Sequence, residues 1–399
     1  MPDDHHSFMG LALEEAERGQ AGGNVPVGSV IVRGGAVIGR GRNRVVSDRD
    51  PTCHAEVDAL RDACRNLDSA DLSGAACYTT MEPCPMCCWA LQEAKIATLV
   101  LGARHAEMRR SGGKEAEMVT GNGELFAVLG EQRYRIDRPW GRWPEHIPVG
   151  IISKCAVDAD GNLYICQRRS TPVLVFDPEG NFLRSWGDGE IADPHGIAAA
   201  PDGRVLVVDR DAHQVLVFDA EGRLLLALGE RHRPRTQAPF NHPTDVAVGP
   251  GGDLYVSDGY GNTMVHRFAP DGAHLASWGE RGSGPGEFTT PHGIGVLGDG
   301  RVLVGDRENN RVQVFSPEGG HLADFGPFYK PMDIHIDGEQ RIFVSDQVPR
   351  VTALGPDGTI FGSCKPVAVM PHGVAGAADG TLYFVETHTT VITRFAPVA

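Results

Sequence analysis

Apolar residues in the first hundred positions follow two different spacings. Spacings of three and four residues predict helices over residues 7–20, 55–65 and 85–94. Short apolar or alternating runs, with the turn Arg-Gly-Gly between the first two, predict strands over residues 25–32, 36–41, 75–80 and 97–103. The resulting order, α-β-β-α-β-α-β, is typical of an α/β sandwich of modest size.

The remainder of the chain has a different pattern, with many short strands separated by Gly/Asp turns. It also repeats, because similar units open at Pro148, Pro194, Pro243, Pro291, Pro331 and Pro371. A period of 40 to 50 residues with several strands per unit is typical of a β-propeller. The sequence therefore predicts a multidomain protein, in which an α/β domain over residues 1–130 and a linker over 131–147 precede an all-β six-bladed β-propeller over 148–399.

Composition and charge narrow the classes of function. The chain has 399 residues, which is more than one compact core usually holds, and a net charge of −15. Both the first 150 residues and the remainder are acidic, so we expect a small-molecule substrate and no nucleic-acid partner.

Targeting signals and cysteine usage indicate a cellular location. No apolar run is long enough to span a membrane, and the first residues lack the pattern of a signal peptide. The nine cysteines are interpreted as metal ligands and buried thiols rather than disulfides. We therefore expect no membrane partner and a cytoplasmic protein.

A metal-ligating motif lies at the starts of two predicted helices. His54 and Glu56 begin one helix, and Cys84 and Cys87 begin another. One imidazole and two thiolates supply three zinc ligands and leave a fourth position for water, which is typical of a catalytic zinc site. Glu56 is the candidate proton carrier between the activated water, a ring nitrogen and the departing amine. A structural zinc knot or a redox Cys-x-x-Cys is the alternative, but neither needs Glu56 beside the histidine.

These motifs resemble the cytidine/deoxycytidylate deaminase superfamily. The segments VPVGSVIV, GRGRN, DPTCHAEVDALRDAC and YTTMEPCPMC carry the resemblance, which lies near guanine, cytosine and tRNA adenosine deaminases. It implies a three-layer α/β fold, a homodimer, substrate contact by Asn43, and a pocket partly lined by backbone near Val25–Val27. Asn43 taken alone could equally be a turn residue. The acidic domain favours a small aminated heterocycle, such as a nucleobase or nucleoside, as the substrate.

Three histidines occupy one repeat position in alternate units. His195, His292 and His372 follow the opening prolines of the second, fourth and sixth units, where the other units carry Val149, Thr244 and Met332. Equivalent positions in a propeller lie on a ring about its axis, so these imidazoles are expected about 120° apart. Three histidines with an open position predict a second zinc or other divalent metal site.

The repeats are NHL-like and resemble the peptidyl-hydroxyglycine amidating lyase, the second catalytic half of peptide-amidating enzymes. HPTDVAVGPGGDLYVSDGYGN, DRENNRVQVF and MPHGVAGAADGTLYFVETHTTVITRF carry the resemblance. It implies that the three histidines bind zinc, that Tyr260 acts on the substrate hydroxyl, and that Arg307 and Arg168 are active-site arginines. Such arginines can bind a carboxylate with two hydrogen bonds. Arg307 could instead be part of a structural Asp-Arg pair, and Tyr260 an ordinary turn residue.

Two positions depart from this family. Gly261 stands where secreted members carry a cysteine, which agrees with an intracellular protein. Gly373 stands where the family has a calcium-binding aspartate, which speaks against a structural calcium ion. No monooxygenase partner lies in this chain, which also speaks against peptide amidation.

Three interpretations of the whole chain remain. The first is a bifunctional enzyme, in which the deaminase acts on a small ring and the propeller cleaves an N–C bond of a carbinolamide-like substrate, as consecutive steps on one compound. The second is a deaminase fused to a non-catalytic NHL module that binds a protein or another ligand. The third, a scaffold without turnover, is disfavoured by the intact set of His54, Glu56, Cys84 and Cys87.

Overall fold

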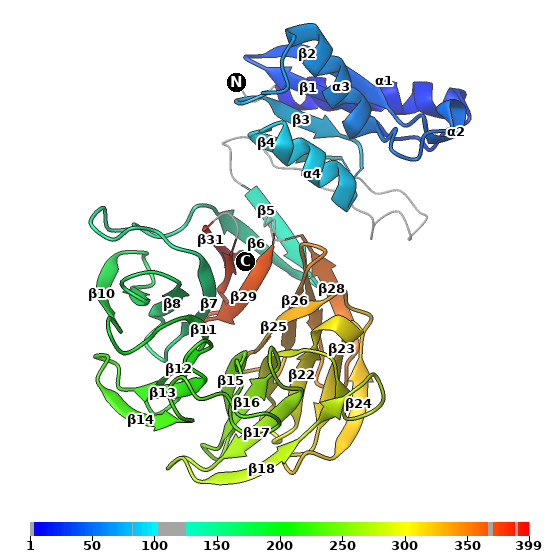
Figure 1. Cartoon of the computed structure of the whole chain (residues 1–399). Coiled ribbons are helices and arrows are strands. Elements are labelled where there is room, and N and C mark those ends of the chain that lie inside the picture. Colours follow the sequence, from blue (N-terminus) through cyan, green and yellow to red (C-terminus); the bar gives the residue numbers. More distant parts are fainter. Residues whose placement is uncertain (1–3, 82, 103–124, 366–369, 388–389, 399) are drawn as a thin grey trace. The chain divides into compact units, whose positions relative to one another are not determined.

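The protein divides into two compact units, Met1–Glu124 and Leu125–Ala399, in the computed structural model (Figure 1). The structure describes residues 4–81, 83–102, 125–365, 370–387 and 390–398. Among the helices of these residues, none is long and apolar enough to cross a membrane. Each unit has hydrophobic clusters of its own.

The first unit is an α/β domain built around one four-stranded sheet. Its elements are α1 (Asp4–Ala21), β1 (Gly28–Arg33), β2 (Ala36–Arg42), α2 (Val45–Asp48), α3 (Ala55–Leu67), β3 (Ala76–Thr79), α4 (Pro85–Glu93) and β4 (Thr98–Leu101). The strand order is β2-β1-β3-β4, with β1 antiparallel to β2 and β3, and β3 parallel to β4. The predicted order of helices and strands is confirmed, and the short helix α2 is an addition to it.

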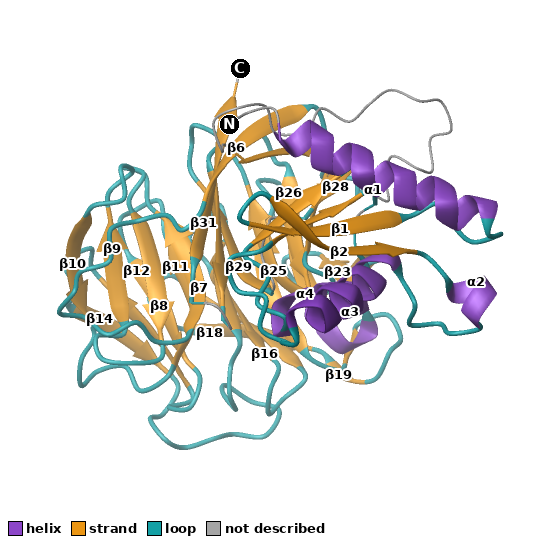
Figure 2. Cartoon of the chain, turned by 90° about the horizontal axis from the view of Figure 1, so that it is seen from above, coloured by secondary structure: helices purple, strands orange, loops and turns teal. Residues whose placement is uncertain are grey.

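Helices cover both faces of this sheet (Figure 2). Val30 and Val32 pack in the cluster that includes residues of α1, whereas Ile31 packs with residues of α3, as the alternation of side chains along a strand requires. Both helices approach the strands closely at glycines. A Cβ on Gly28 would lie 2.1 Å from Ala12 O, and one on Gly41 would lie 2.1 Å from Ala59 N. The described part is thus a three-layer α/β/α arrangement.

The second unit consists of antiparallel sheets. The first four-stranded sheet contains β7 (Ile152–Val157), β8 (Leu163–Gln167), β9 (Val173–Phe176) and β10 (Phe182–Trp186). The second contains β11 (Pro194–Ala199), β12 (Val205–Asp209), β13 (Gln214–Phe218) and β14 (Leu224–Leu228). The third contains β15 (Asp245–Val248), β16 (Leu254–Asp258), β17 (Met264–Phe268) and β18 (His274–Trp278), and is followed by the short parallel pair β19 (Glu280–Arg281) and β20 (Glu287–Phe288).

The remaining sheets continue this pattern. The fourth sheet contains β21 (Pro291–Val296), β22 (Val302–Asp306), β23 (Arg311–Phe315) and β24 (His321–Phe325), and the 3-10 turn η1 (Arg307–Asn309) lies between β22 and β23. The fifth sheet contains β25 (Pro331–Ile336), β26 (Ile342–Asp346), β27 (Arg350–Leu354) and β28 (Ile360–Cys364). A five-stranded sheet combines β29 (Pro371–Gly376), β30 (Leu382–Glu386) and β31 (Ile392–Val398) with β6 (Gln132–Asp137) and β5 (Leu125–Leu129).

The first strands of these sheets form a continuous series of contacts. In order, β7 contacts β11, β11 contacts β15, β15 contacts β21, β21 contacts β25, β25 contacts β29, and β29 contacts β7. The second strands are buried along their length, which explains their nearly continuous apolar runs. The unit is therefore propeller-like, as Figure 1 shows.

The predicted linker is wrong, because residues 131–147 are not a spacer between the units. Gln132–Asp137 form β6, which pairs antiparallel with β31 and with β5, and the first unit ends at Glu124 rather than at residue 130. The pairing of β6 with β31 joins residues about 260 positions apart, from Arg394 with Asp137 to Val398 with Arg133. A contact so remote in sequence leaves no local periodicity, which is why β6 resembled a linker.

The predicted register of the first repeat in the second unit also needs correction. Val149 was matched to the three histidines, but Ser153 on β7 occupies that position. The backbone oxygen of Ser153 accepts a hydrogen bond from His372, as those of Thr244 and Met332 accept from the other two histidines. The proline at position 148 lies four residues before β7, whereas Pro194, Pro291, Pro331 and Pro371 each start a strand and Pro243 lies two residues before β15.

Candidate metal centres

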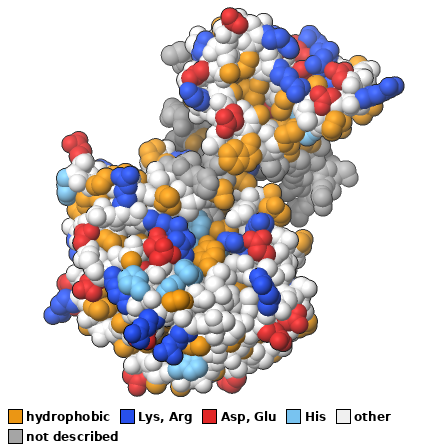
Figure 3. Space-filling view, viewed as in Figure 1, with side chains coloured by type: hydrophobic (Ala, Val, Ile, Leu, Met, Phe, Trp, Pro, Cys, Tyr) orange, Lys and Arg blue, Asp and Glu red, His pale blue; other side chains and the backbone are white. Residues whose placement is uncertain are grey.

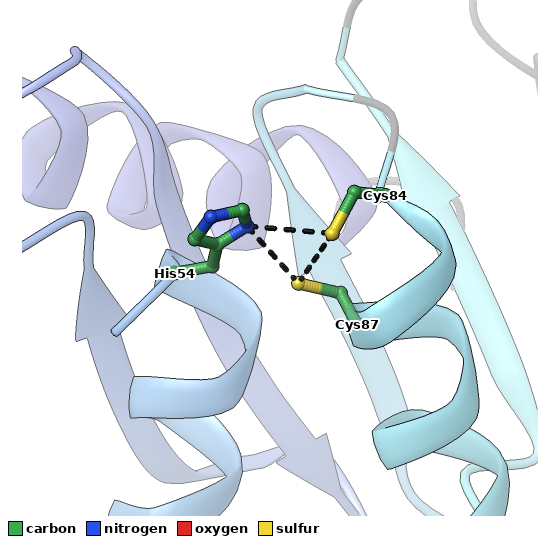
Figure 4. A group of neighbouring side chains, drawn as sticks. All are labelled: His54, Cys84 and Cys87. Atoms are coloured by element: carbon green, nitrogen blue, oxygen red, sulfur yellow. Dashed lines mark hydrogen bonds between the residues drawn. The ribbon is translucent and has the colours of Figure 1, made fainter. Parts of the chain in front are cut away.

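The first candidate site lies where two helices of the first unit begin. His54 immediately precedes α3 with an extended backbone, and Cys84 immediately precedes α4 in the same way (Figure 4). Cys87 lies in the first turn of α4 and is buried. A proline stands at the start of α4, where an N–H group would have no partner within the helix. The helix starts thus bring together the three residues that the motif predicted.

The distances between the three side chains fit one zinc ion. His54 Nδ1 lies 3.4 Å from Cys84 Sγ and 3.5 Å from Cys87 Sγ, and the two sulfurs are 3.6 Å apart. Tetrahedral zinc, with bonds of about 2.3 Å to sulfur and about 2.05 Å to nitrogen, would separate two sulfurs by about 3.8 Å and sulfur from nitrogen by about 3.6 Å. Burial and the nearby Glu56 raise the pKa of Cys87, so a bound cation is needed to hold this sulfur as a thiolate.

Glu56 lies in the first turn of α3 and is almost fully buried, with 3% of its surface exposed. Its Oε1 accepts a hydrogen bond of 2.8 Å from Thr79 Oγ1 at the end of β3. Thr79 is itself fully buried. Thr79 was not among the predicted site residues, although it lies within the YTTMEPCPMC segment, because its spacing from Glu56 belongs to no motif. Thr79, at the end of strand β3, therefore fixes the position of Oε1 of Glu56.

Asn43 is buried beside β2, but its side chain already has a local role. Its Oδ1 accepts a hydrogen bond of 3.2 Å from Val45 N, and its backbone N–H donates to Val27 O over 2.9 Å. These bonds fit the turn interpretation and also hold Asn43 against the Val25–Val27 backbone. None of the contacts given for the described residues joins Asn43 to the three ligands, so its role in substrate binding stays a prediction.

The second candidate site joins three histidines from alternate sheets of the second unit. The ring centroids of His195, His292 and His372 are 5.1, 5.1 and 5.2 Å apart, and the rings are inclined at 73–74° to each other. All three are buried. The nearly equal separations place the three imidazoles symmetrically about one point, and the ligand atoms are close enough for one metal ion.

Hydrogen bonds from the backbone orient all three imidazoles in the same way. The Nδ1 atoms of His195, His292 and His372 lie 2.7, 2.6 and 2.6 Å from the carbonyl oxygens of Thr244, Met332 and Ser153. A carbonyl can only accept, so each Nδ1 carries the proton and each Nε2 keeps its lone pair as an acceptor or metal ligand. Burial lowers the pKa of all three histidines, that of His372 to about 4, which favours the neutral form that binds metals.

Tyr260 lies against two of these imidazoles. Its hydroxyl is 3.0 Å from His195 Nε2 and 3.1 Å from His292 Nε2, and 38% of the residue is exposed. Arg307 donates from a terminal nitrogen to the same hydroxyl over 3.4 Å. Its guanidinium carbon lies 5.4 Å from the centre of the Tyr260 ring, within cation–π range. The structure thus brings Tyr260 and Arg307 together with the histidines.

Arg168 is linked to the surroundings of Tyr260 through Asp193 and Arg210. Its Nε lies 3.5 Å from Asp193, which also forms an ion pair of 2.7 Å with Arg210. The guanidinium carbon of Arg210 lies 5.7 Å from the Tyr260 ring centre. Figure 3 shows histidine, basic and acidic side chains gathered on one face of the second unit.

Arg210 and Asp193 were not among the predicted site residues. Arg168, Arg210 and Arg307 each follow directly after the second strand of their sheet, so they are equivalent in the repeat. A comparison of this repeat position would have found the third arginine.

Comparisons with known proteins support both units. Residues 2–103 match the family described as cytidine and deoxycytidylate deaminase zinc-binding region, and residues 192–218, 240–268 and 288–315 match the NHL repeat. Over 104 residues the chain is 38% identical to the tRNA-specific adenosine deaminase of Buchnera aphidicola subsp. Schizaphis graminum, an alignment that covers 26% of this chain and 69% of the relative. The resemblance to deaminases is confirmed.

The second unit has relatives of two names. The chain is 30% identical over 312 residues to peptidyl-glycine alpha-amidating monooxygenase B of Xenopus laevis, which covers 64% of this chain but only 35% of the relative. It is also 30% identical over 298 residues to human NHL repeat-containing protein 3, covering 66% of this chain and 84% of the relative. The chain thus spans about a third of the length of the amidating relative.

A solved structure agrees in fold. A streptogramin B lyase structure aligns with a TM-score of 0.51 at 12% identity, covering 68% of this chain and all of that one. The cysteines and histidines that form the two candidate centres lie in the matched units, and the nine cysteines, all among the described residues, form no disulfide. The chain therefore belongs to the cytidine and deoxycytidylate deaminase family through its N-terminal unit and to the NHL-repeat proteins through its C-terminal unit.

Proposed function

We propose that the first unit is a zinc-dependent hydrolytic deaminase of a small aminated heterocycle. The observation that carries this proposal is the buried carboxylate of Glu56, which Thr79 orients next to His54, Cys84 and Cys87. A structural zinc site would not need a buried acid at this position. The family match supports a deaminase, and the acidic charge of the domain favours a small substrate over RNA.

The residues of this chain divide the work of hydrolysis between them. Zinc held by His54, Cys84 and Cys87 would supply Lewis-acid activation of a water molecule. The water oxygen forms a bond to the ring carbon that bears the amine, and the carbon–nitrogen bond then breaks. Glu56 takes the proton from the water and delivers it to the nitrogen that leaves as ammonia. Because Thr79 occupies Oε1, Oε2 is the oxygen left for this transfer.

Ammonia release tests this proposal. The full chain loaded with zinc is screened on guanine, cytosine, adenosine and a pterin-like amine, with a tRNA substrate as a further arm because a relative carries that name. Turnover of a small ring is expected, and Glu56→Gln should abolish it while the zinc content stays unchanged. Turnover of tRNA alone would refute the small-substrate assignment, and activity retained in Glu56→Gln would refute the role of Glu56.

We further propose that the second unit is a closed six-bladed propeller with a metal-dependent lyase site. Six sheets of four or five strands among the described residues support this number of blades, and the pairing of β31 with β6 supports closure. Three Nε2 lone pairs, each fixed by a backbone carbonyl, supply ligands for zinc or another divalent ion. Tyr260 and Arg307 stand beside the open side of this centre.

The chemistry that fits these groups is cleavage of a carbinolamide. Tyr260 removes the proton of the substrate hydroxyl, the carbon–oxygen bond becomes a carbonyl, and the carbon–nitrogen bond breaks. The amide nitrogen takes up a proton as it leaves, so the reaction consumes no water. Arg307 and Arg168 can hold a carboxylate on the same carbon. The bound metal would supply polarisation of the reacting oxygen.

Metal content and glyoxylate release test the second site together. Two zinc-type metals per chain are expected, with one lost in Cys87→Ala and the other lost in His292→Ala. An N-acyl-α-hydroxyglycine should release glyoxylate with the wild-type chain and not with His292→Ala. A single metal that survives both His195→Ala and His292→Ala would refute the lyase proposal. That result would favour the alternative supported by the NHL match, a deaminase fused to a non-catalytic binding module.

A further inference from the structure

A second ring of residues lies one position after the histidine ring in every sheet. After each histidine comes a glycine, and after each of Ser153, Thr244 and Met332 comes a charged residue. The six positions are held by Lys154, Gly196, Asp245, Gly293, Asp333 and Gly373. The histidine ring and the charged ring therefore alternate, with three bulky side chains in each.

The three charged residues contact each other directly. Lys154 Nζ forms ion pairs with Asp245 Oδ2 and, over 2.7 Å, with Asp333 Oδ1. These side chains come from β7, β15 and β25, which are alternate members of the series of first strands. Only 8% of Lys154 and 1% of each aspartate is exposed. Buried charges in proteins are normally paired, and here one ammonium is shared by two carboxylates.

Backbone N–H groups donate hydrogen bonds to both carboxylates. Asp245 accepts hydrogen bonds from Val246 N over 2.8 Å and from Ile294 N over 3.1 Å. Asp333 accepts from the equivalent positions, Ile334 N over 2.7 Å and Val374 N over 2.8 Å. In each case one donor lies on the same strand and the other on the first strand of the next sheet. Each carboxylate thus ties two sheets together at the centre of the unit.

The glycines provide the space that this arrangement needs. A Cβ on Gly293 would lie 2.7 Å from Asp333 Cα, and one on Gly373 would lie 3.1 Å from Lys154 Cα. An aspartate at position 373, as a calcium-binding relative would have, would therefore press on the Lys154 backbone. It would also add a third buried carboxylate to the ring. The residues present do not fit the calcium ion that the lyase resemblance would otherwise imply.

We propose that the ammonium of Lys154 is the resident cation of this ring, and that the ring of Asp245 and Asp333 consequently binds no divalent metal. The C-terminal unit then takes its metal at the histidine ring alone. The charged ring carries a net charge of −1 one residue away from the histidines, which favours a cation bound between them. This inference concerns the cation at the centre of the unit and holds whether or not the unit is catalytic.

Calcium-dependent unfolding of the full chain tests the proposal. Four of the five tryptophans (Trp140, Trp143, Trp186 and Trp278) lie in the C-terminal unit, so fluorescence follows its unfolding. The midpoint temperature of thermal unfolding of the wild-type chain should be the same in metal-stripped buffer with and without added calcium. Lys154→Met leaves two facing carboxylates unpaired, so its midpoint should fall on the order of 10 °C, and calcium should restore most of that loss. A single calcium ion should then bind per variant chain.

The double variant Lys154→Met/Asp245→Asn is the matched control. It keeps the ring at a net charge of −1 but removes the facing pair of carboxylates, so it should fold and give no calcium response. If Lys154→Met folds in neither buffer, a folded and calcium-insensitive double variant still supports the proposal, whereas an unfolded one overturns it. Calcium bound by the wild-type chain at this ring, or a Lys154→Met midpoint equal to wild type without calcium, also overturns it.

Discussion

Thr79 is a position at which a single hydroxyl should control the deaminase reaction. Its Oγ1 lies 2.8 Å from Glu56 Oε1 and 3.2 Å from Met81 O, and a hydroxyl has one proton, so the shorter bond to the carboxylate is favoured. Thr79→Val replaces that hydroxyl with a methyl group of nearly the same size. The fully buried site then gains no cavity, and only the hydrogen bond is lost.

The size of the effect follows from the charge of the acceptor. A buried hydrogen bond to a charged group contributes about 1.5–3 kcal/mol. If the bond orients Glu56 throughout proton transfer, its full loss lowers kcat/KM by about 10- to 150-fold, since each 1.4 kcal/mol is tenfold. The zinc ligands are not touched, so the zinc content should remain at the wild-type value.

Steady-state ammonia release and zinc analysis measure both quantities on the same preparation. Thr98→Val, at an exposed position of β4, is the matched control and should keep wild-type activity. A Thr79→Val enzyme with full zinc and undiminished kcat/KM would refute the view that Thr79 positions the catalytic carboxylate. A parallel loss of zinc would show instead that the substitution disturbs the ligand geometry.

Three further predictions concern packing, pH and the second site. Gly41→Ala should destabilise the N-terminal unit by about 1–3 kcal/mol or more, because the new Cβ would lie 2.1 Å from Ala59 N. Gly10→Ala, where the new Cβ meets no atom within 4 Å, should not destabilise the unit. Thermal unfolding of the two variants compares these effects. Burial lowers the pKa of His335 from 6.5 to about 4, so the unfolded chain takes up this proton at a higher pH than the folded chain does. The free energy of unfolding should therefore fall as the pH drops from about 6.5 toward 4. Urea unfolding at a series of pH values should show a shallower fall for His335→Leu. Arg210→Ala should raise KM for a carboxylate-bearing carbinolamide about tenfold with little change in metal content, and an unchanged KM in the glyoxylate assay would exclude Arg210 from substrate binding.

Local sequence was sufficient for the three metal ligands and Glu56 of the first site, because each of them lies in a short motif at the start of a helix. His54 and Cys84 each begin a helix, and the three-residue step from Cys84 to Cys87 places both sulfurs on one side of a helical turn. The alternation of His195, His292 and His372 was likewise visible, because a repeat converts spacing along the chain into angles around an axis. Thr79 could not be found in this way, since its contact with Glu56 depends on how β3 packs against α3.

The start of the C-terminal unit shows the opposite case. Pro148 resembled the other repeat prolines, yet the strand begins at Ile152 and places Ser153 beside His372. β6 was interpreted as part of a linker and β5 as the end of the first domain, because β31, the strand that pairs with β6, lies at the far end of the chain. Pairing between distant strands depends on how the whole unit folds rather than on the composition of either strand.

The residue pattern alone therefore established two units, their element types and the donor atoms of both candidate centres, because helix starts and repeat periods are properties of neighbouring residues. Tertiary structure alone decided which groups support those donors: the hydroxyl of Thr79, the three carbonyls behind the imidazoles, and the ammonium of Lys154 between two carboxylates. Each of these contacts joins residues that are tens to hundreds of positions apart. Burial then gives them their energetic weight, because a polar group removed from water must find its partner within the fold.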